Sequence, residues 1–381
     1  MKHNNKTILV TYPDDFIISE AKSLVSSIPE YEIIKVFKQK YLNRAKYGMG
    51  SGKAQEIEEF VKESKDIETI IVDEHLSSKQ IFNLEQLLGI KVIDRERLIL
   101  DIFYSRATTI EAKLQIQLAE IQYQMPRVRD KAKLMSKSNE RAGKGGMGEY
   151  IVDVQFRDLK RQMSFIKEKI KNAQLKRQVY HQQRLKMGTT IVSLVGYTSS
   201  GKTTLFNLLT GEDKETSASL FTTLSTTTRS LNAPNKNNTN NKHDSNVDIL
   251  IVDTVGFISR LPHYMIDAFK STLEESLAAD LILLLIDCSE DLNNIKIKYS
   301  SCWKVLEELK VNKSRVSVVL SKADKVTSDA IKKIYEQLDI DTNTNNVIIS
   351  SKTGYGIHKL KNTLMSKQYI KNESERISSV H

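Results

Sequence analysis

A glycine-containing loop between an apolar run and a helical pattern constrains this chain most. Residues 196–203 read Gly-Tyr-Thr-Ser-Ser-Gly-Lys-Thr; they follow an apolar run at 191–195 and precede apolar residues at helical spacing at 205–209. In a strand, loop and helix of this kind, backbone N–H groups turn around a phosphate chain, Lys202 reaches the β- and γ-phosphates, and Thr203 offers a hydroxyl to Mg²⁺. The motif predicts an α/β domain that binds a nucleoside triphosphate. A glycine turn without a ligand is the alternative.

The composition is that of a globular protein with room for two or three domains. Of 381 residues, 40% are hydrophobic, with 15 Gly and 5 Pro, so each domain can bury a core. Two cysteines, Cys288 and Cys302, are too few for a disulfide framework, and no charged region followed by an apolar one opens the chain. The longest apolar run, near residues 281–286, is too short to cross a bilayer. We expect a cytoplasmic protein with no transmembrane segment and at most peripheral membrane contact.

The net charge of +10 is concentrated in one middle segment. Within residues 106–186 basic side chains outnumber acidic ones by more than two to one, and the rest of the chain is close to neutral. A phosphate backbone is the partner that such a segment fits best. A solvated helical face is the alternative.

The first 95 residues alternate short β-branched runs with helical patterns. The runs and the patterns lie at residues 7–11, 33–36, 54–64, 69–72, 78–88 and 91–93. This alternation predicts a small α/β domain with a mainly parallel sheet. The stretch from Gly48 to Lys53 looks like a second phosphate loop, but Tyr47 replaces its first glycine and Ala54 its hydroxyl. We interpret it as a glycine-rich helix entry.

The middle segment predicts two long antiparallel helices. Apolar residues recur every three or four positions from Phe103 to Met125 and again from Phe156 to Ala173, which fits the seam of a helical hairpin. Pro126 is expected to end the first helix, and residues 127–150 to form a flexible tip. This tip has almost no aromatic residues, so it suits contact with the backbone of folded RNA better than base stacking. The candidate RNA-binding residues are Arg127, Arg129, Lys131, Lys133, Lys137, Arg141 and Lys144.

Two further motifs predict the triphosphate end of the site. A predicted strand at 247–252 ends in Asp253-Thr254-Val255-Gly256, in which Asp253 is expected to hold Mg²⁺ through water and the Gly256 N–H to sense the γ-phosphate. Thr223 is a candidate Mg²⁺ ligand beside Thr203. It belongs to the earlier stretch Phe221-Thr222-Thr223-Leu224-Ser225. The candidate catalytic residues are Lys202, Thr223 and Gly256.

Later motifs favour guanine as the base. A run at 316–320 leads into Ser321-Lys322-Ala323-Asp324, and a carboxylate here can accept two hydrogen bonds from guanine N1–H and the 2-amino group, a donor pair that adenine lacks. A run at 347–349 leads to Ser350-Ser351-Lys352, whose backbone can donate to guanine O6. The order of the motifs favours GTP over ATP, so we expect GTP and GDP as ligands, with Mg²⁺. The remaining predicted nucleotide contacts are Gly196, Tyr197, Thr198, Ser199, Ser200 and Gly201.

These motifs together resemble those of the HflX family of translational GTPases. The most specific part is Asp253-Thr254-Val255-Gly256-Phe257-Ile258, followed by Leu-Pro-His at 261–263 and Ala-Phe-Lys-Ser-Thr-Leu-Glu-Glu at 268–275. Residues 48–57, 92–95, 100–103 and 115–127 also match. The resemblance implies GTP hydrolysis and binding to the large ribosomal subunit, with the hairpin near the peptidyl-transferase region. Some members of the family dissociate ribosomes under stress, so the resemblance implies this activity as a further expectation.

The chain departs from the family pattern at several positions. Ser199 stands where an Asn helps to hold an activating monovalent cation in related GTPases, and Ser321 replaces the Asn of the guanine motif, which predicts weaker affinity with guanine selectivity retained. Phe257 stands where Ras-like proteins have a water-orienting Gln, so we expect slow intrinsic hydrolysis. His263 could participate in hydrolysis, although a structural role is the simpler interpretation. The Asn-rich residues 232–246 are interpreted as an extension without function.

We expect a small α/β domain at residues 1–105, a basic helical hairpin at 106–187, a Ras-like P-loop GTPase domain at 188–370 and a tail at 371–381. We expect no extra domain after the guanine site. The free protein is expected to be a monomer.

Two functions remain open. In one, GTP hydrolysis drives a ribosome-bound cycle that splits or rescues ribosomes under stress. In the other, the chain is an RNA-binding module in which GTP selects a conformation and hydrolysis is incidental.

Overall fold

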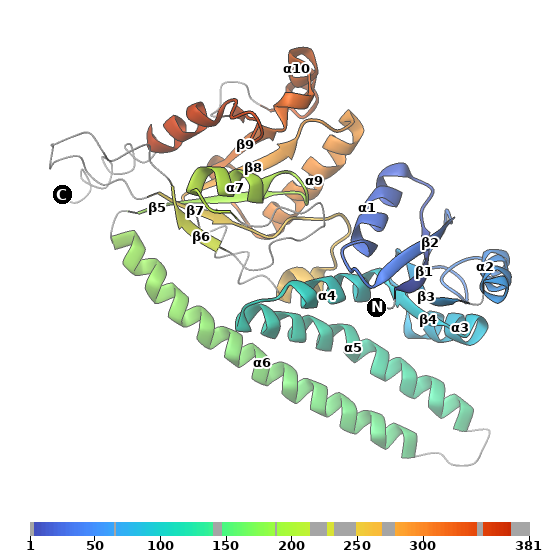
Figure 1. Cartoon of the computed structure of the whole chain (residues 1–381). Coiled ribbons are helices and arrows are strands. Elements are labelled where there is room, and N and C mark those ends of the chain that lie inside the picture. The colour runs from blue at the N-terminus through green and yellow to red at the C-terminus, as the bar shows by residue number, and fades with distance from the viewer. Residues whose placement is uncertain are drawn as a thin grey trace. The chain divides into compact units, whose positions relative to one another are not determined.

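A computed structural model divides the chain into two compact units, Met1–Asn172 and Ala173–His381 (Figure 1). The residues that it describes are 4–64, 66–139, 147–186, 189–213, 227–231, 249–268, 279–340 and 346–366. Among these described residues each unit has one sheet, and the mixed α/β architecture confirms the predicted fold class.

The first unit begins with a four-stranded parallel sheet in the order β2-β1-β3-β4. Its strands are β1 (Asn5–Thr11), β2 (Tyr31–Lys38), β3 (Ile67–Val72) and β4 (Lys91–Asp94). The helices are α1 (Asp15–Val25), α2 (Ser51–Glu63), α3 (Ser78–Leu88) and α4 (Arg95–Arg106). Parallel pairing requires crossover connections, which these helices supply, as the alternating sequence pattern predicts.

Local capping explains where three of these helices begin. The side chain of Asp14 caps α1, Ser77 and Gln80 form a capping box at α3, and Asp94 caps α4. The fourth, α2, begins directly after Gly50 without a side-chain cap. The glycine-rich stretch is thus a helix entry, as interpreted from the sequence.

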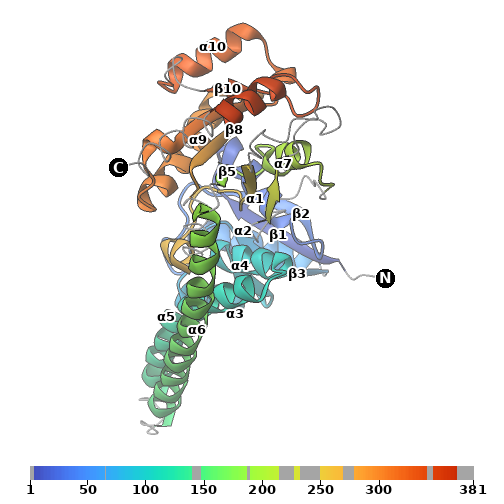
Figure 2. The ribbon, with the colours of Figure 1, turned by 90° about the vertical axis from the view of Figure 1, so that its left-hand side faces the viewer.

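The helical hairpin consists of α5 (Ile110–Asn139) and α6 (Met147–Lys186), which run side by side in the views of Figures 1 and 2. Two details of the prediction are wrong. The first apolar stripe belongs to two helices, because the chain is extended at Ala107 and the Thr109 hydroxyl accepts the Ala112 N–H (3.2 Å) at the start of α5. Pro126 does not end the helix but lies inside α5, which tolerates the loss of one backbone hydrogen bond.

The predicted flexible tip is therefore too long. Residues 127–139 continue α5 and residues 147–150 already belong to α6. The two helices also interact across the hairpin: the Arg129 guanidinium lies 4.1 Å from the centre of the Phe156 ring.

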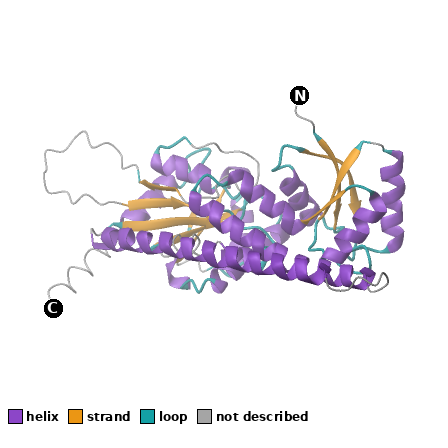
Figure 3. Cartoon of the chain, turned by 90° about the horizontal axis from the view of Figure 1, so that it is seen from below, coloured by secondary structure: helices purple, strands orange, loops and turns teal. Residues whose placement is uncertain are grey.

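The second unit is built on a six-stranded sheet in the order β10-β9-β8-β5-β7-β6, shown in orange in Figure 3. All neighbours pair in parallel except β6 with β7. The strands are β5 (Thr190–Gly196), β6 (Thr227–Ser230), β7 (Ile249–Asp253), β8 (Leu281–Asp287), β9 (Val316–Ser321) and β10 (Val347–Ile348). The helices with defined bounds are α7 (Lys202–Thr210), α9 (Leu292–Glu308) and α10 (Ser328–Gln337), with short 3₁₀ turns at Lys313–Arg315 and Ala323–Lys325.

This sheet brings the predicted motifs to one edge. Every residue of the central strands β5 and β8 is buried, as expected for parallel strands covered on both faces. Because β5, β7, β8 and β9 are parallel, the loops after them emerge together, at the edge where open α/β sheets bind ligands. In the part of the chain that the structure describes, no helix is long and apolar enough to cross a membrane.

Candidate nucleotide-binding site

The loop between β5 and α7 has the backbone of a phosphate cradle. Gly196 allows a close approach, since a Cβ there would lie 2.4 Å from the carbonyl oxygen of Leu285. Ser199 and Gly201 both adopt left-handed conformations, with φ of 62° and 93°. Such a curled loop at a helix N-terminus turns backbone N–H groups inward, and the helix dipole adds partial positive charge.

Lys202, the first residue of α7, is directed back into the cradle. Its ammonium donates to the carbonyl oxygens of Gly196 (3.1 Å) and Tyr197 (2.8 Å), and the residue is buried. Burial lowers the pKa of Lys202 to about 8, and Asp253 opposes this shift. An anionic phosphate chain would favour the charged amine.

The neighbouring Thr203 faces the carboxylate at the end of β7. Its hydroxyl lies 3.2 Å from Oδ2 of Asp253, a fully buried residue. A hydroxyl and a carboxylate at the phosphate end of a nucleotide cradle are hard oxygen donors of the kind that Mg²⁺ selects. The donor set therefore fits this ion.

The segment after β7 lies directly against the phosphate loop. Phe257 donates its N–H to the Gly196 carbonyl (3.0 Å) and accepts the Thr198 N–H at its own carbonyl (2.8 Å), which forms a one-residue β-bridge. A Cβ on Gly256 would lie 2.8 Å from Cγ2 of Thr198 and 3.0 Å from Nζ of Lys202. Only a glycine fits without displacing the loop, so Gly256, the residue expected to sense the γ-phosphate, is in contact with the cradle.

Sequence reasoning missed the role of Tyr197 at this junction. Its side-chain hydroxyl accepts the N–H of Ser259 at 2.7 Å, so the phosphate loop holds the following segment through a side chain as well as the backbone. Lys298 of α9 lies 5.1 Å from the centre of the same ring and forms an ion pair with Glu290 (2.5 Å). No sequence motif marks Lys298, because its neighbourhood arises only when α9 packs on β8.

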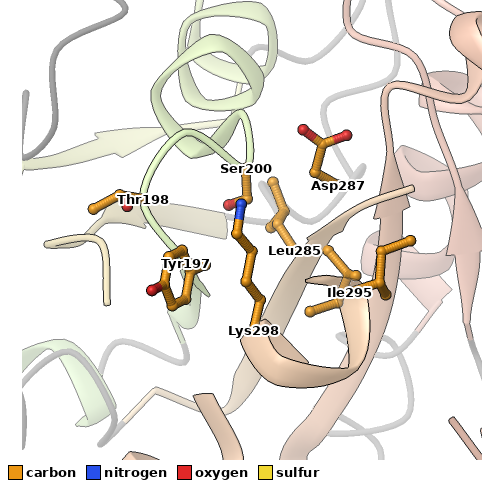
Figure 4. Close-up of a pocket in the computed structure, with 8 residues that line it drawn as sticks. Tyr197, Thr198, Ser200, Leu285, Asp287, Ile295 and Lys298 are labelled. Carbon is orange, nitrogen blue, oxygen red and sulfur yellow. The ribbon is translucent and has the colours of Figure 1, made fainter. Parts of the chain in front are cut away.

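A cavity of about 10 Å³ lies behind the phosphate loop (Figure 4). Its lining includes Tyr197, Ser200, Asp287, Ile295 and Lys298, and the Lys298 side chain extends toward Ser200 in Figure 4. This volume has room for one water molecule at most, so it is far too small for a nucleotide.

The guanine motif is tied to the phosphate loop by Ser321, which stands where the resemblance implies an Asn. The Ser321 hydroxyl lies 2.8 Å from the Ser200 carbonyl oxygen and 3.1 Å from the Ile286 carbonyl oxygen, and Ser321 is 3% exposed. The next residue, Lys322, is in a left-handed conformation (φ 61°) and pairs with Asp287 at 2.5 Å. A shorter side chain thus still links the two loops.

The carboxylate expected to read guanine is held in place by a residue of the loop after β10. Oδ1 of Asp324 accepts a hydrogen bond from the Ser350 hydroxyl at 2.6 Å, which lowers the pKa of the Asp324 carboxyl. Ser350 is fully buried, whereas Asp324 is exposed. Ser351 and Lys352 follow in a turn, and the Ala323 N–H donates to the Ile349 carbonyl (3.1 Å), which closes the base end of the site.

The structure therefore brings together the predicted residues at 196–203, 253–256, 321–324 and 350–352. The stretch Phe221–Ser225, with the candidate ligand Thr223, lies outside the described residues. So does the Asn-rich insert at 232–246. His263 is exposed and contacts Glu308 (2.9 Å), which fits the structural interpretation.

The RNA-binding prediction needs one correction, at Arg127. Its guanidinium donates to Oδ2 of Asp94 (2.8 Å) and to the Leu76 carbonyl (3.0 Å), and it stacks 3.9 Å from the centre of the Tyr123 ring. Its side chain is 18% exposed. Arg127 joins α5 to the first sheet and is not a free cation at a tip.

The other predicted cations stay predictions. Arg129 stacks on the facing helix, as described above, while Lys131, Lys133 and Lys137 lie on α5. Arg141 and Lys144 lie outside the described residues.

Family models cover most of the chain. A model described as GTP-binding GTPase N-terminal matches residues 17–104, one described as GTP-binding GTPase Middle Region matches 106–184, and one described as 50S ribosome-binding GTPase matches 191–322. The fold and the site define a GTP-hydrolysing enzyme of the P-loop class.

The relatives give a narrower assignment. GTPase HflX of Methanocaldococcus jannaschii is 39% identical over 348 residues, which span 91% of this chain and 82% of that protein. GTPase HflX of Caldanaerobacter subterraneus is 35% identical over 93% of this chain and 77% of its own. The chain belongs to the HflX family of GTPases.

Solved structures agree on the fold. A GTP-binding protein from Sulfolobus solfataricus in complex with GDP is 25% identical, with a TM-score of 0.50 over 96% of this chain and 99% of that one. The structure described as SsGBP and GDP complex is 24% identical, with a TM-score of 0.54 over 96% and 98% of the two chains.

Proposed function

We propose that this GTPase works on the large ribosomal subunit and that the site described above is where it binds GTP. The family model described as a 50S ribosome-binding GTPase supports the choice of partner. The basic hairpin provides charge that RNA phosphates would attract. A ribosome-bound protein of this kind would act in the cytoplasm.

The observation that carries the nucleotide assignment is the contact between the cradle and the segment after β7. Lys202 would neutralise the β- and γ-phosphates, and Thr203, with Asp253 through water, would hold Mg²⁺, which supplies charge neutralisation at the phosphates. Gly256 would direct its N–H to the γ-phosphate, and Thr223 would complete the metal ligands. At the other end, Asp324 would accept the guanine donors.

Intrinsic hydrolysis is expected to be slow for a structural reason. Phe257 is 4% exposed and has a side chain that can neither donate to nor accept from water. The group that orients the attacking water therefore has to come from elsewhere, and the ribosome would supply or order it. We propose ribosome splitting or rescue as the outcome of this cycle.

GTP turnover by the full chain, alone and with purified large ribosomal subunits, tests the proposal. We expect strong stimulation by large subunits, none by small subunits, and none by large subunits when Lys202 is replaced by Ala. If large subunits bind in a GTP-dependent manner but turnover does not rise, the protein is instead an RNA-binding module whose nucleotide selects a conformation. Sedimentation of intact ribosomes after incubation with protein and GTP tests splitting separately.

A further inference from the structure

The loop between β2 and α2, residues 39–50, is held against the rest of the first unit by hydrogen bonds and by buried side chains. We call it the basic loop. Two side chains of α3 donate to its backbone: Gln80 to the Ala45 carbonyl (3.1 Å) and Asn83 to the Lys46 carbonyl (2.9 Å). Such side-chain bonds hold the main chain of a surface loop in one conformation. The basic loop is therefore a preformed surface.

The basic loop also contains strained backbone. Asn43 and Ala45 have positive φ angles of 58° and 61°, a conformation that Asn tolerates but that is costly for Ala. Leu42 and Met49 anchor the loop by burying their side chains in the core of the unit. Strain of this kind persists only where the surroundings over-determine the backbone, and it gathers at functional sites.

The side chains that this backbone presents to solvent are cations around an aromatic ring. No acidic residue occurs from residue 33 to residue 55. Tyr41 is 53% exposed, and Lys40 and Arg44 lie 5.5 Å and 5.2 Å from the centre of its ring. Within the described part of the chain, none of the exposed cations of this surface forms an ion pair with a carboxylate. These cations are Lys40, Arg44 and Lys46.

We propose that the basic loop is an RNA-binding surface that recognises an unpaired nucleotide. A base would stack on the Tyr41 ring in place of the cation that lies over that face, and Lys40, Arg44 and Lys46 would contact the phosphates on either side. The exposed ring distinguishes this surface from the hairpin, whose predicted cations suit backbone contact only. The proposal rests on the proposed function in its choice of RNA as the partner, and it adds a second contact, on a different element.

The test measures binding of the full chain to a fluorescent 20-nucleotide polyuridine strand at several salt concentrations. The double variant Arg44→Gln/Lys46→Gln should bind more weakly, and its logarithmic salt slope should fall by about 1.4, since each lost phosphate contact on a single strand contributes about 0.7. Tyr41→Ala should bind about tenfold more weakly with little change in that slope. The matched control Lys22→Gln/Lys91→Gln removes the same charge from exposed sites elsewhere in the unit and should bind like wild type.

Each alternative result has a defined meaning. Equal losses in the loop variant and the charge control overturn the proposal, because the effect would then be one of net charge. Full displacement by polyglutamate at the same charge concentration as polyuridine also overturns it, in favour of an acidic protein partner. GTP turnover of the free variants should equal that of wild type, and a loss there would indicate misfolding and count against a local surface role for the loop. Wild-type polyuridine binding by both loop variants, with ribosome-stimulated turnover intact, overturns the loop proposal while the proposed function stands.

Discussion

Replacing Arg127 with Met should destabilise the first unit, although the sequence places this residue among RNA-binding candidates. Breaking a buried ion pair by removing one partner costs about 3–5 kcal/mol. Here the cost is smaller, since Asp94 keeps three other donors: the N–H groups of Leu76 (3.2 Å) and Arg97 (2.9 Å) and the hydroxyl of Tyr123 (3.0 Å). Met retains the apolar stem but loses two charge-assisted hydrogen bonds and the stacking on Tyr123, so we expect a loss of roughly 2–3 kcal/mol.

Thermal unfolding followed by calorimetry checks this expectation. For a unit of this size, a loss of that order lowers the midpoint by about 5–10 °C. The control is Arg129→Met, which removes only the stacking on Phe156 and should cost at most about 1 kcal/mol. A variant at position 127 with a wild-type midpoint but weaker binding to large ribosomal subunits would refute the structural role and restore Arg127 as an RNA contact.

Three further predictions concern the nucleotide site. Burial lowers the pKa of Lys202 to about 8, and bound phosphate favours the charged amine. GDP affinity, measured by fluorescence titration, should therefore be highest where the free amine is protonated and about tenfold weaker at pH 9 than at pH 7. Equal affinities at the two pH values would contradict this prediction. Ser321→Ala should weaken GDP binding by about tenfold while Ser321→Asn retains it, because Ala cannot link the guanine loop to the Ser200 carbonyl. Asp324→Asn should shift preference from guanosine to xanthosine nucleotides in competition binding, and retained guanine selectivity would move base recognition to another residue.

The backbone geometry of the candidate nucleotide site was predictable because its information is local. A phosphate loop needs glycine at positions of unusual backbone geometry and a lysine at a fixed offset, and the structure has Gly196, Gly201 and Lys202 in those roles. The strands on both sides were visible as apolar runs, since parallel strands bury both faces. Parallel connection then brought distant motifs to one edge.

The features that sequence reasoning missed depend on contacts between residues that are far apart in the chain. Arg127 looked like one more cation in a basic run, yet its acceptors lie 33 and 51 residues earlier, at the ends of elements that meet only in the folded unit. Pro126 looked like a helix end because proline disrupts helices in general, but one lost hydrogen bond is small beside the contacts of a 30-residue helix. Composition likewise masked the basic loop, because acidic residues elsewhere in the first block cancel its charge.

The bridge between Tyr197 and Phe257 bears on how a nucleotide state becomes a conformational state. Two backbone hydrogen bonds and the Tyr197 hydroxyl join the phosphate loop to the segment that follows β7. A ligand shifts a conformational equilibrium only by binding the two states with different affinity. GTP and GDP differ only at the γ-phosphate, and we expect the Gly256 N–H, where this residue meets the cradle, to be one of the groups that contact it. Gly256 is the residue directly before Phe257. A displacement of the Gly256 N–H toward a phosphate would therefore strain the two backbone hydrogen bonds between Phe257 and the phosphate loop. We therefore expect this bridge to contribute to the free-energy difference between the GTP-bound and GDP-bound states.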